Sequence, residues 1–229
     1  MSGRSPGTAS PRRVRGKPAP KRGQGRPPQA DADLRRANIL AATRVLLKER
    51  SPAKITRFDI GRAAKVDPAL IRYYFGDKSM LFREVIRECI DDLRRRRNAL
   101  PAGGTTAEKL RARLKVWLDF FSETPHFHEL VIEEVFFGEA NEARDLLSQF
   151  VQRVYPDLEA LVKTGIREGD LRSVEPRFVY IALIALCEFF VTAAPLVEEL
   201  FGVDRMDKRL IGSYGDFAAD LLVEGLKRR

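Results

Sequence analysis

Residues 56–75 read TRFDIGRAAKVDPALIRYYF, and this stretch decides the fold. Thr56 and Asp59 form a capping-box pattern, in which each side chain satisfies a free backbone amide at the start of a helix. Asp67 and Pro68 mark a second start, with an N-cap acid followed by a proline that needs no amide partner. Two short helices separated by so tight a turn are typical of a helix-turn-helix, which can lay its second helix in the major groove of DNA.

The flanking sequence completes a three-helix unit. Apolar residues at helical spacing predict a first helix over about residues 33–50. After a break at Gly76-Asp77, a long fourth helix begins near Lys78. We therefore expect an N-terminal DNA-binding domain over residues 33–82.

Several polar side chains of this unit suit DNA. Thr56 presents a hydroxyl and free amides at a helix N-terminus, where a phosphate oxygen can bind. Arg72, Tyr73 and Tyr74 gather long hydrogen-bond donors at the end of the next helix, and Lys78 begins the helix after it. An arginine such as Arg72 can bind a guanine through two hydrogen bonds. A solvated residue at a helix end is the plainer alternative for it.

Taken together, these residues resemble the tetracycline-repressor (TetR) family of bacterial transcription regulators over about residues 33–82. The matching positions are Ile39-Leu40-Ala41-Ala42, Ile60, Ala63-Ala64, Val66-Asp67, Ile71-Arg72-Tyr73-Tyr74-Phe75, Lys78 and Leu81-Phe82. The resemblance implies a homodimeric, sequence-specific DNA-binding regulator, usually a repressor, that a small-molecule effector releases from double-stranded DNA. Beyond residue 100 only the length and the helix layout agree with the family.

The resemblance also implies roles for single residues. Thr56 and Lys78 would contact phosphates. Residues in the recognition helix would face base edges, namely Pro68, Ala69 and Leu70. Tyr73 and Tyr74 would either pack against the core or bind a phosphate.

Three positions depart from the family pattern. The family usually has Ala where this chain has Gly61, and Gly where this chain has Lys65. If the backbone at Lys65 has a positive φ, the side chain adds about 1 kcal/mol of strain, although it could gain a phosphate contact. Arg72 stands where tyrosine is common, so the operator sequence cannot be inferred from relatives.

The rest of the chain, residues 83–229, has the pattern of a second helical domain for ligand binding and dimerisation, so we expect an all-α fold. Thr105 and Glu108 form another capping box after the boundary at residues 101–104. Further helices are expected over about 124–138, 141–168, 176–201 and 204–227. No hairpin dipeptide lies between alternating apolar runs, as paired strands would require.

Bulky aromatic residues in this half can enclose an apolar cavity for a small ligand. The family resemblance carries that interpretation, because each aromatic residue alone is ordinary core. The candidate pocket residues are Trp117, Phe121, Phe137, Phe150 and Glu188. Glu133 and Glu134 could also orient a ligand if they are buried.

The last two expected helices have the character of a dimer interface. One face of the final helix carries Leu210, Tyr214, Phe217 and Leu221. The helix before it is apolar on nearly every side, so more than one neighbour must cover it. Two copies would form a four-helix bundle, and twofold symmetry then predicts recognition helices about one DNA turn apart on a near-palindromic operator.

A metal-dependent enzyme or metal sensor is the competing class. His126 and His128 are the only histidines, but a spacing of two turns their rings to different faces of a helix. A site using one of them with Glu129 or Glu133 is the form this alternative would take. The sequence lacks phosphate loops and hydrolase motifs, so we expect no catalytic residue, cofactor or metal. A helical interaction module without DNA would leave the tyrosine–lysine cluster unexplained.

The formal net charge of +9 is concentrated in residues 1–32, which carry eight basic residues and one acid. Their prolines and glycines predict a disordered basic arm, which either follows DNA phosphates or only keeps the chain in solution. No apolar stretch follows those charges, as a signal peptide would require. Residues 178–197 are long and apolar enough for a membrane span, but Glu188 and Pro195 favour a buried helix. Two distant cysteines fit a reducing cytosol, so we expect a cytoplasmic, nucleoid-associated protein without a membrane partner.

Overall fold

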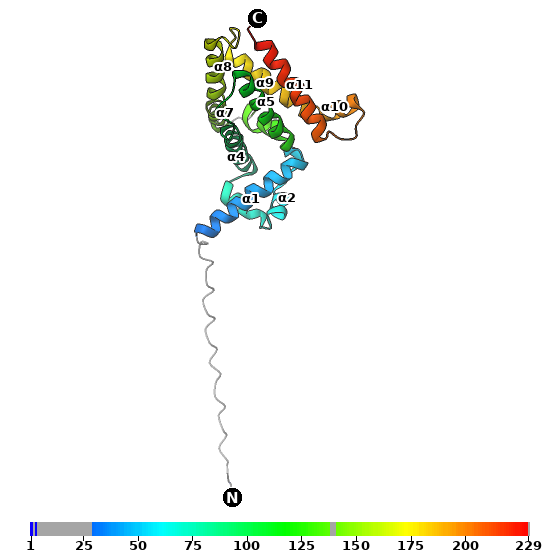
Figure 1. Ribbon diagram of the computed structural model, residues 1–229. Coiled ribbons are helices and arrows are strands. Elements are labelled where there is room, and N and C mark those ends of the chain that lie inside the picture. Colours follow the sequence, from blue (N-terminus) through cyan, green and yellow to red (C-terminus); the bar gives the residue numbers. More distant parts are fainter. Residues whose placement is uncertain (2, 4–28, 138–140, 229) are drawn as a thin grey trace.

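The structure, a computed structural model, describes residues 1, 3, 29–137 and 141–228. A small helical head lies at one end of a larger helical body (Figure 1). The head consists of α1 (Gln29–Glu49), the short 3-10 turn η1 (Pro52–Lys54), α2 (Arg57–Ala64) and α3 (Pro68–Phe75). The long helix α4 (Lys78–Asn98) leaves the head and runs into the body.

The body is built around α5 (Thr106–Glu123), which packs against α4, α8, α9 and α11. Its other elements are α6 (Phe127–Val131), the π-helical turn η2 (Ile132–Phe136), α7 (Asn141–Val154), α8 (Pro156–Glu168), α9 (Pro176–Thr192), α10 (Ala194–Phe201) and α11 (Lys208–Leu226). The described residues form one isolated bridge, between Leu171 and Lys227, and no strand. The expected all-α class is confirmed.

The expected helix starts at α2, α3 and α5 are confirmed. The Thr56 hydroxyl accepts a hydrogen bond from the Asp59 amide at 3.2 Å, and the Asp59 carboxylate accepts one from the Thr56 amide at 3.0 Å. The Asp67 carboxylate accepts a hydrogen bond from the backbone amide of Ala69, the second residue of α3, at 2.7 Å. Thr105 and Glu108 form the same reciprocal pair before α5. These bonds satisfy amides that have no partner within their own helix.

Two helices expected to be continuous are broken, which corrects the sequence interpretation. The segment 141–168 divides into α7 and α8 at Pro156, and 176–201 divides into α9 and α10 with a bend of 72° near Pro195. Proline has no amide to donate and its ring crowds the preceding turn, so the apolar pattern continues where the helix does not. No single described helix is long and apolar enough to cross a membrane; α9 and α10 reach the required length only as this bent pair.

Two expected boundaries are also corrected. The predicted basic arm, residues 1–32, lies mostly outside the described residues, but its last four residues belong to α1. Asp31 stands in the first turn of α1, where an acid is favoured by the helix dipole. α11 begins at Lys208 rather than residue 204, because Asp207 caps it by accepting a hydrogen bond from the Leu210 amide at 2.8 Å.

α2 and the start of α3 pack closely at Gly61. A Cβ atom added to Gly61 would lie 2.9 Å from Cγ of Pro68 and 3.0 Å from the carbonyl oxygen of Val66. Glycine normally weakens a helix interior. Here it makes room for the proline that starts α3.

Gly61→Ala should therefore lower the free energy of unfolding by about 1–3 kcal/mol, since the added methyl overpacks the α2–α3 contact. In urea unfolding, Pro68→Ala in the same chain should recover part of that loss, with a coupling of at least about 0.5 kcal/mol. Helix propensity alone predicts the opposite sign for Gly61→Ala, so a stabilised variant would contradict this account.

Candidate nucleic-acid interface

One face of the head gathers exposed side chains from α2 and α3. A shallow hollow of about 280 Å³ on this surface, which we call the α2–α3 face, is lined by Arg57, Phe58, Pro68, Ala69, Arg72 and Tyr73. The four residues on α3 were candidates from the sequence, and the two on α2 were not. Phe58 is 73% exposed. In the sequence, the position of Phe58 outside the apolar stripe of α2 was the signal that could have identified it as a surface residue.

The outward direction of this face follows from what α3 buries. Ile71 and Phe75 pack into the core of the head. Residues on the opposite side of the helix, Ala69, Arg72 and Tyr73, must then point to solvent. Among the described residues, the Arg72 guanidinium has no hydrogen-bond or ion-pair partner that would hold it against the protein.

The two tyrosines take different positions. Tyr73 is 61% exposed, whereas Tyr74 is half-buried against the core. Their rings meet edge to face with centroids 5.0 Å apart. The Tyr74 hydroxyl is buried and has no hydrogen-bond partner within the described part of the chain. Tyr73 is thus available to a phosphate, and Tyr74 packs against both the Tyr73 ring and the core.

Thr56 is exposed at the start of α2, but its hydroxyl is engaged. It donates to a carboxylate oxygen of Asp59 at 2.6 Å. Hydrogen bonds from the Thr56 hydroxyl and amide, helped by the charge of Arg50, lower the pKa of Asp59. Arg50 lies 3.6 Å from that carboxylate and offsets its charge. A phosphate arriving here would meet the open end of α2 rather than the hydroxyl.

Lys65 has the left-handed backbone conformation that its position in the turn between α2 and α3 suggested. It is the C-cap of α2, with a φ of +55°. No other described residue except glycine has a positive φ. Its side chain is exposed beside the α2–α3 face. Lys65 therefore bears backbone strain that glycine would avoid, and the chain keeps a positive charge at this position.

Lys78 has a structural role that the sequence did not reveal. Its ammonium donates to the carbonyl oxygens of Pro52 at 3.2 Å and of Ile55 at 3.1 Å. It also lies 5.0 Å from the centroid of the Phe82 ring, a cation–π distance. These bonds use two of the three ammonium protons and leave one for a phosphate.

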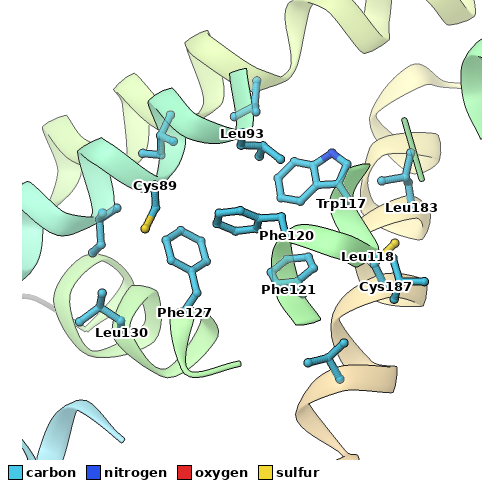
Figure 2. Close-up of a cluster of buried hydrophobic side chains, with 14 of the residues drawn as sticks. Cys89, Leu93, Trp117, Leu118, Phe120, Phe121, Phe127, Leu130, Leu183 and Cys187 are labelled. Atoms are coloured by element: carbon cyan, nitrogen blue, oxygen red, sulfur yellow. The ribbon is translucent and has the colours of Figure 1, made fainter. Parts of the chain in front are cut away.

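The candidate pocket residues do not line one cavity. Trp117 and Phe121 stack with centroids 5.5 Å apart, inside the closed aromatic cluster that also holds Phe120 and Phe127 (Figure 2). Phe137 is 77% exposed at the end of η2. The two cavities that touch this cluster measure about 20 Å³ each, room for about one water.

The remaining candidate pocket residues, Phe150 and Glu188, are only half-buried, on α7 and α9. Glu134, in contrast, is buried, but it faces α4. It accepts a hydrogen bond from Ser79 and lies 3.5 Å from Nε of Arg83, which is also buried. Glu134 therefore joins η2 to the start of α4.

The two histidines take separate acidic partners. His126 lies 3.2 Å from Glu129, and His128 pairs with Glu188 on α9. Within the described ranges, no group of three or more His, Cys, Asp and Glu residues could hold a metal ion. The metal-dependent alternative has no support.

A second exposed apolar surface lies along α9 and α11, with a groove of about 750 Å³ between them. Two of the expected dimer residues, Phe217 and Leu221, are exposed there, beside Phe178 and Phe189 of α9. The other two, Leu210 and Tyr214, are half-buried. The Tyr214 ring stacks on Phe190 and its hydroxyl donates to the Leu186 carbonyl at 2.6 Å. We call this surface the α9–α11 face.

The chain is similar to known regulators along most of its length. Residues 39–85 match the family described as bacterial regulatory proteins, tetR family, and residues 105–228 match the tetracyclin repressor-like C-terminal domain. The HTH-type transcriptional repressor NicS of Pseudomonas putida is 26% identical over 205 residues, covering 86% of this chain and 94% of NicS.

Two solved structures share the fold. The ketosteroid transcriptional regulator KstR2 of Mycobacterium tuberculosis matches 85% of this chain and 96% of its own, with a TM-score of 0.65 and 15% identity. The transcriptional regulator FadR from Bacillus subtilis, solved in complex with stearoyl-CoA, matches 82% of this chain and 98% of its own, with a TM-score of 0.63 and 17% identity.

Replacing Lys65 by glycine should raise the unfolding temperature by roughly 2–4 °C, because it removes about 1 kcal/mol of backbone strain. Lys65→Ala keeps a Cβ in the left-handed region and loses only the charge, so its unfolding temperature should stay close to that of the wild type. Thermal unfolding of both variants at one protein concentration checks this. Equal stability of the two variants would show that the turn is not strained.

Proposed function

This chain belongs to the TetR family of DNA-binding transcription regulators, and we propose that it is a repressor whose α2–α3 face holds double-stranded DNA until a small-molecule effector binds the body. The observation that carries the proposal is the meeting of Pro68, Ala69, Arg72 and Tyr73 on one exposed face. In this proposal residues 33–82 read DNA and residues 83–229 bind the effector and a second copy of the chain. The protein is not an enzyme, and it works in the cytoplasm on the nucleoid.

The exposed side chains divide by chemistry into two groups. Arg72 projects from α3 with an unengaged guanidinium and suits the O6 and N7 atoms of a guanine in the major groove. Arg57 and Tyr73 lie beside it and, with the exposed Lys65 of the α2–α3 turn, suit phosphates, which position the protein without reading sequence. Pro68 and Ala69 are small and apolar, so they let α3 approach the base edges closely.

Homodimerisation through the α9–α11 face is the second part of the proposal. Exposed rings of Phe178, Phe189 and Phe217 form a large apolar surface, which marks an interaction site in a folded protein. A pair of helices from each copy would cover it as a four-helix bundle. Twofold symmetry then presents two α3 helices to a near-palindromic operator.

Effector control follows from the path of α4, which joins the head to the body. The structure of FadR in complex with stearoyl-CoA supports the proposal that a regulator of this fold binds a small-molecule ligand, which we place in the body of this chain. Such a ligand releases DNA only if it binds more tightly to the arrangement of heads that does not fit the operator.

Arg72→Ala should cost about 1–3 kcal/mol of binding free energy on the cognate operator and relax preference at one base position in each half-site. Arg57→Ala should instead weaken binding to every sequence similarly and reduce the salt slope by about 1. Fluorescence anisotropy on operator variants across a salt series separates the two effects. Arg167→Ala, on an exposed position of α8, is the control. Wild-type behaviour of both head variants would refute these assignments.

Phe217→Glu should convert the dimer to a monomer, because it places a charge on the apolar α9–α11 face. Light scattering after size exclusion measures the mass directly. Val151→Glu, at an exposed apolar position on α7, should leave the dimer intact. If the wild type is already monomeric, or if Val151→Glu disrupts it equally, the assigned interface is incorrect.

A further inference from the structure

A groove of about 760 Å³ lies at the end of α4 that is farthest along the chain from the head. Its walls come from the C-terminal end of α4, the α4–α5 loop, α5 and α8. Apolar side chains line part of it, including Leu100 and Leu161, and three basic residues line the rest, Arg97, Lys109 and Arg113. None of these groove residues was a site candidate from the sequence alone.

The groove holds more positive than negative charge. Its lining contains three basic side chains and two acidic ones, Glu108 and Asp157. Glu108 accepts a hydrogen bond from the Thr105 amide at 2.8 Å as part of the α5 cap. Asp157 pairs with Arg97 at 2.7 Å. Both carboxylates are therefore already engaged.

Arg113 is the basic residue of the groove that has no direct partner. Its side chain has no hydrogen bond and no ion pair within 4.0 Å in the described ranges 29–137 and 141–228, whereas the nearby Asp157 is already paired with Arg97. Arg113 is half-buried; burial and then the like charge of Arg97 lower the pKa of Arg113, and the charge of Asp157 opposes them in part. A partly desolvated guanidinium without a direct partner carries a free-energy cost that an anion would reduce.

A small closed cavity of about 20 Å³, room for about one water, lies inward of the groove. It shares Arg97 and Arg113 with the groove and is also lined by Trp117 and Tyr180. The Tyr180 hydroxyl is buried without a hydrogen-bond partner among the described residues. The groove is therefore charged and open, and aromatic residues close the space behind Arg97 and Arg113.

We infer that this groove is the effector site and that its ligand is a small organic monoanion, a carboxylate on an apolar body. The carboxylate would form a two-pronged pair with the Arg113 guanidinium, the geometry for which arginine is suited. The apolar body would cover Leu100 and Leu161 in the groove. This inference rests on the proposed function, because it names the ligand class of that regulator.

The position of the groove explains how such a ligand would act. Arg97 is the penultimate residue of α4, and Lys78, at its N-terminal end, holds the head. A ligand that draws Arg113 of α5 and Arg97 of α4 together changes the packing at one end of a single rigid helix. The head moves with the other end.

The only tryptophan of the chain, Trp117, lines the small cavity behind Arg113, so its fluorescence reports on changes at Arg113. Full-length protein is titrated with sodium octanoate and, separately, with octanamide, which has the same chain without the charge. Octanoate should change the Trp117 fluorescence saturably, and octanamide should need at least a tenfold higher concentration. Arg113→Gln should weaken octanoate binding at least tenfold and leave octanamide binding unchanged, whereas Arg167→Gln should behave as the wild type.

The proposal is overturned if octanoate does not bind the wild type, if octanamide binds equally well, or if Arg113→Gln keeps its affinity for octanoate. Thermal unfolding shows whether Arg113→Gln folds; removal of an unpaired cation should not lower its unfolding temperature. Saturating octanoate should also release operator DNA from the wild type but not from Arg113→Gln, and retention of DNA by the wild type overturns the effector role. A protein that binds octanoate through Arg113 but never binds DNA refutes the proposed function instead, and leaves the anion site standing.

Discussion

The Lys78 ammonium ties the DNA-facing head to the rest of the molecule. It donates to the carbonyl oxygens of Pro52 and Ile55, in the segment that ends one residue before the cap of α2. Because Lys78 is also the first residue of α4, the start of the long helix and the start of the helix-turn-helix are held at one point. The direction of the α2–α3 face therefore follows the direction of α4.

A second contact holds the same end of α4 to the body. Ser79 donates to Glu134 of η2, and the buried Arg83 lies beside the same carboxylate. Burial raises the pKa of Glu134, which shows how costly a charge is at this place. Such a pair adds little net stability but is sensitive to the loss of either partner. The N-terminal end of α4, near the head, is thus held to the body, whereas its C-terminal end borders the basic groove that a ligand can reach.

Interactions between residues close in the sequence, such as helix caps, were predictable from the sequence. Interactions between residues far apart in the sequence were not. The cap formed by Thr56 and Asp59 needs only residues three apart, so its pattern could be read directly. The break at Pro156 was missed because the apolar spacing runs on across the proline. The partners of Lys78 lie 23 and 26 residues away, and the walls of the groove around Arg113 come from three helices and a loop. Only the folded chain brings such groups together.

The central claim is that two symmetry-related α2–α3 faces read one stretch of duplex DNA. Selection of fragments of the source genome by the purified full-length protein at moderate salt, followed by sequencing, tests it most directly. The account predicts enrichment of a near-palindromic site. The centres of its two half-sites should lie one helical turn apart, which is about 34–36 Å, or slightly farther. Recovery of fragments in proportion to their abundance, or of a single unsymmetrical site, would contradict it.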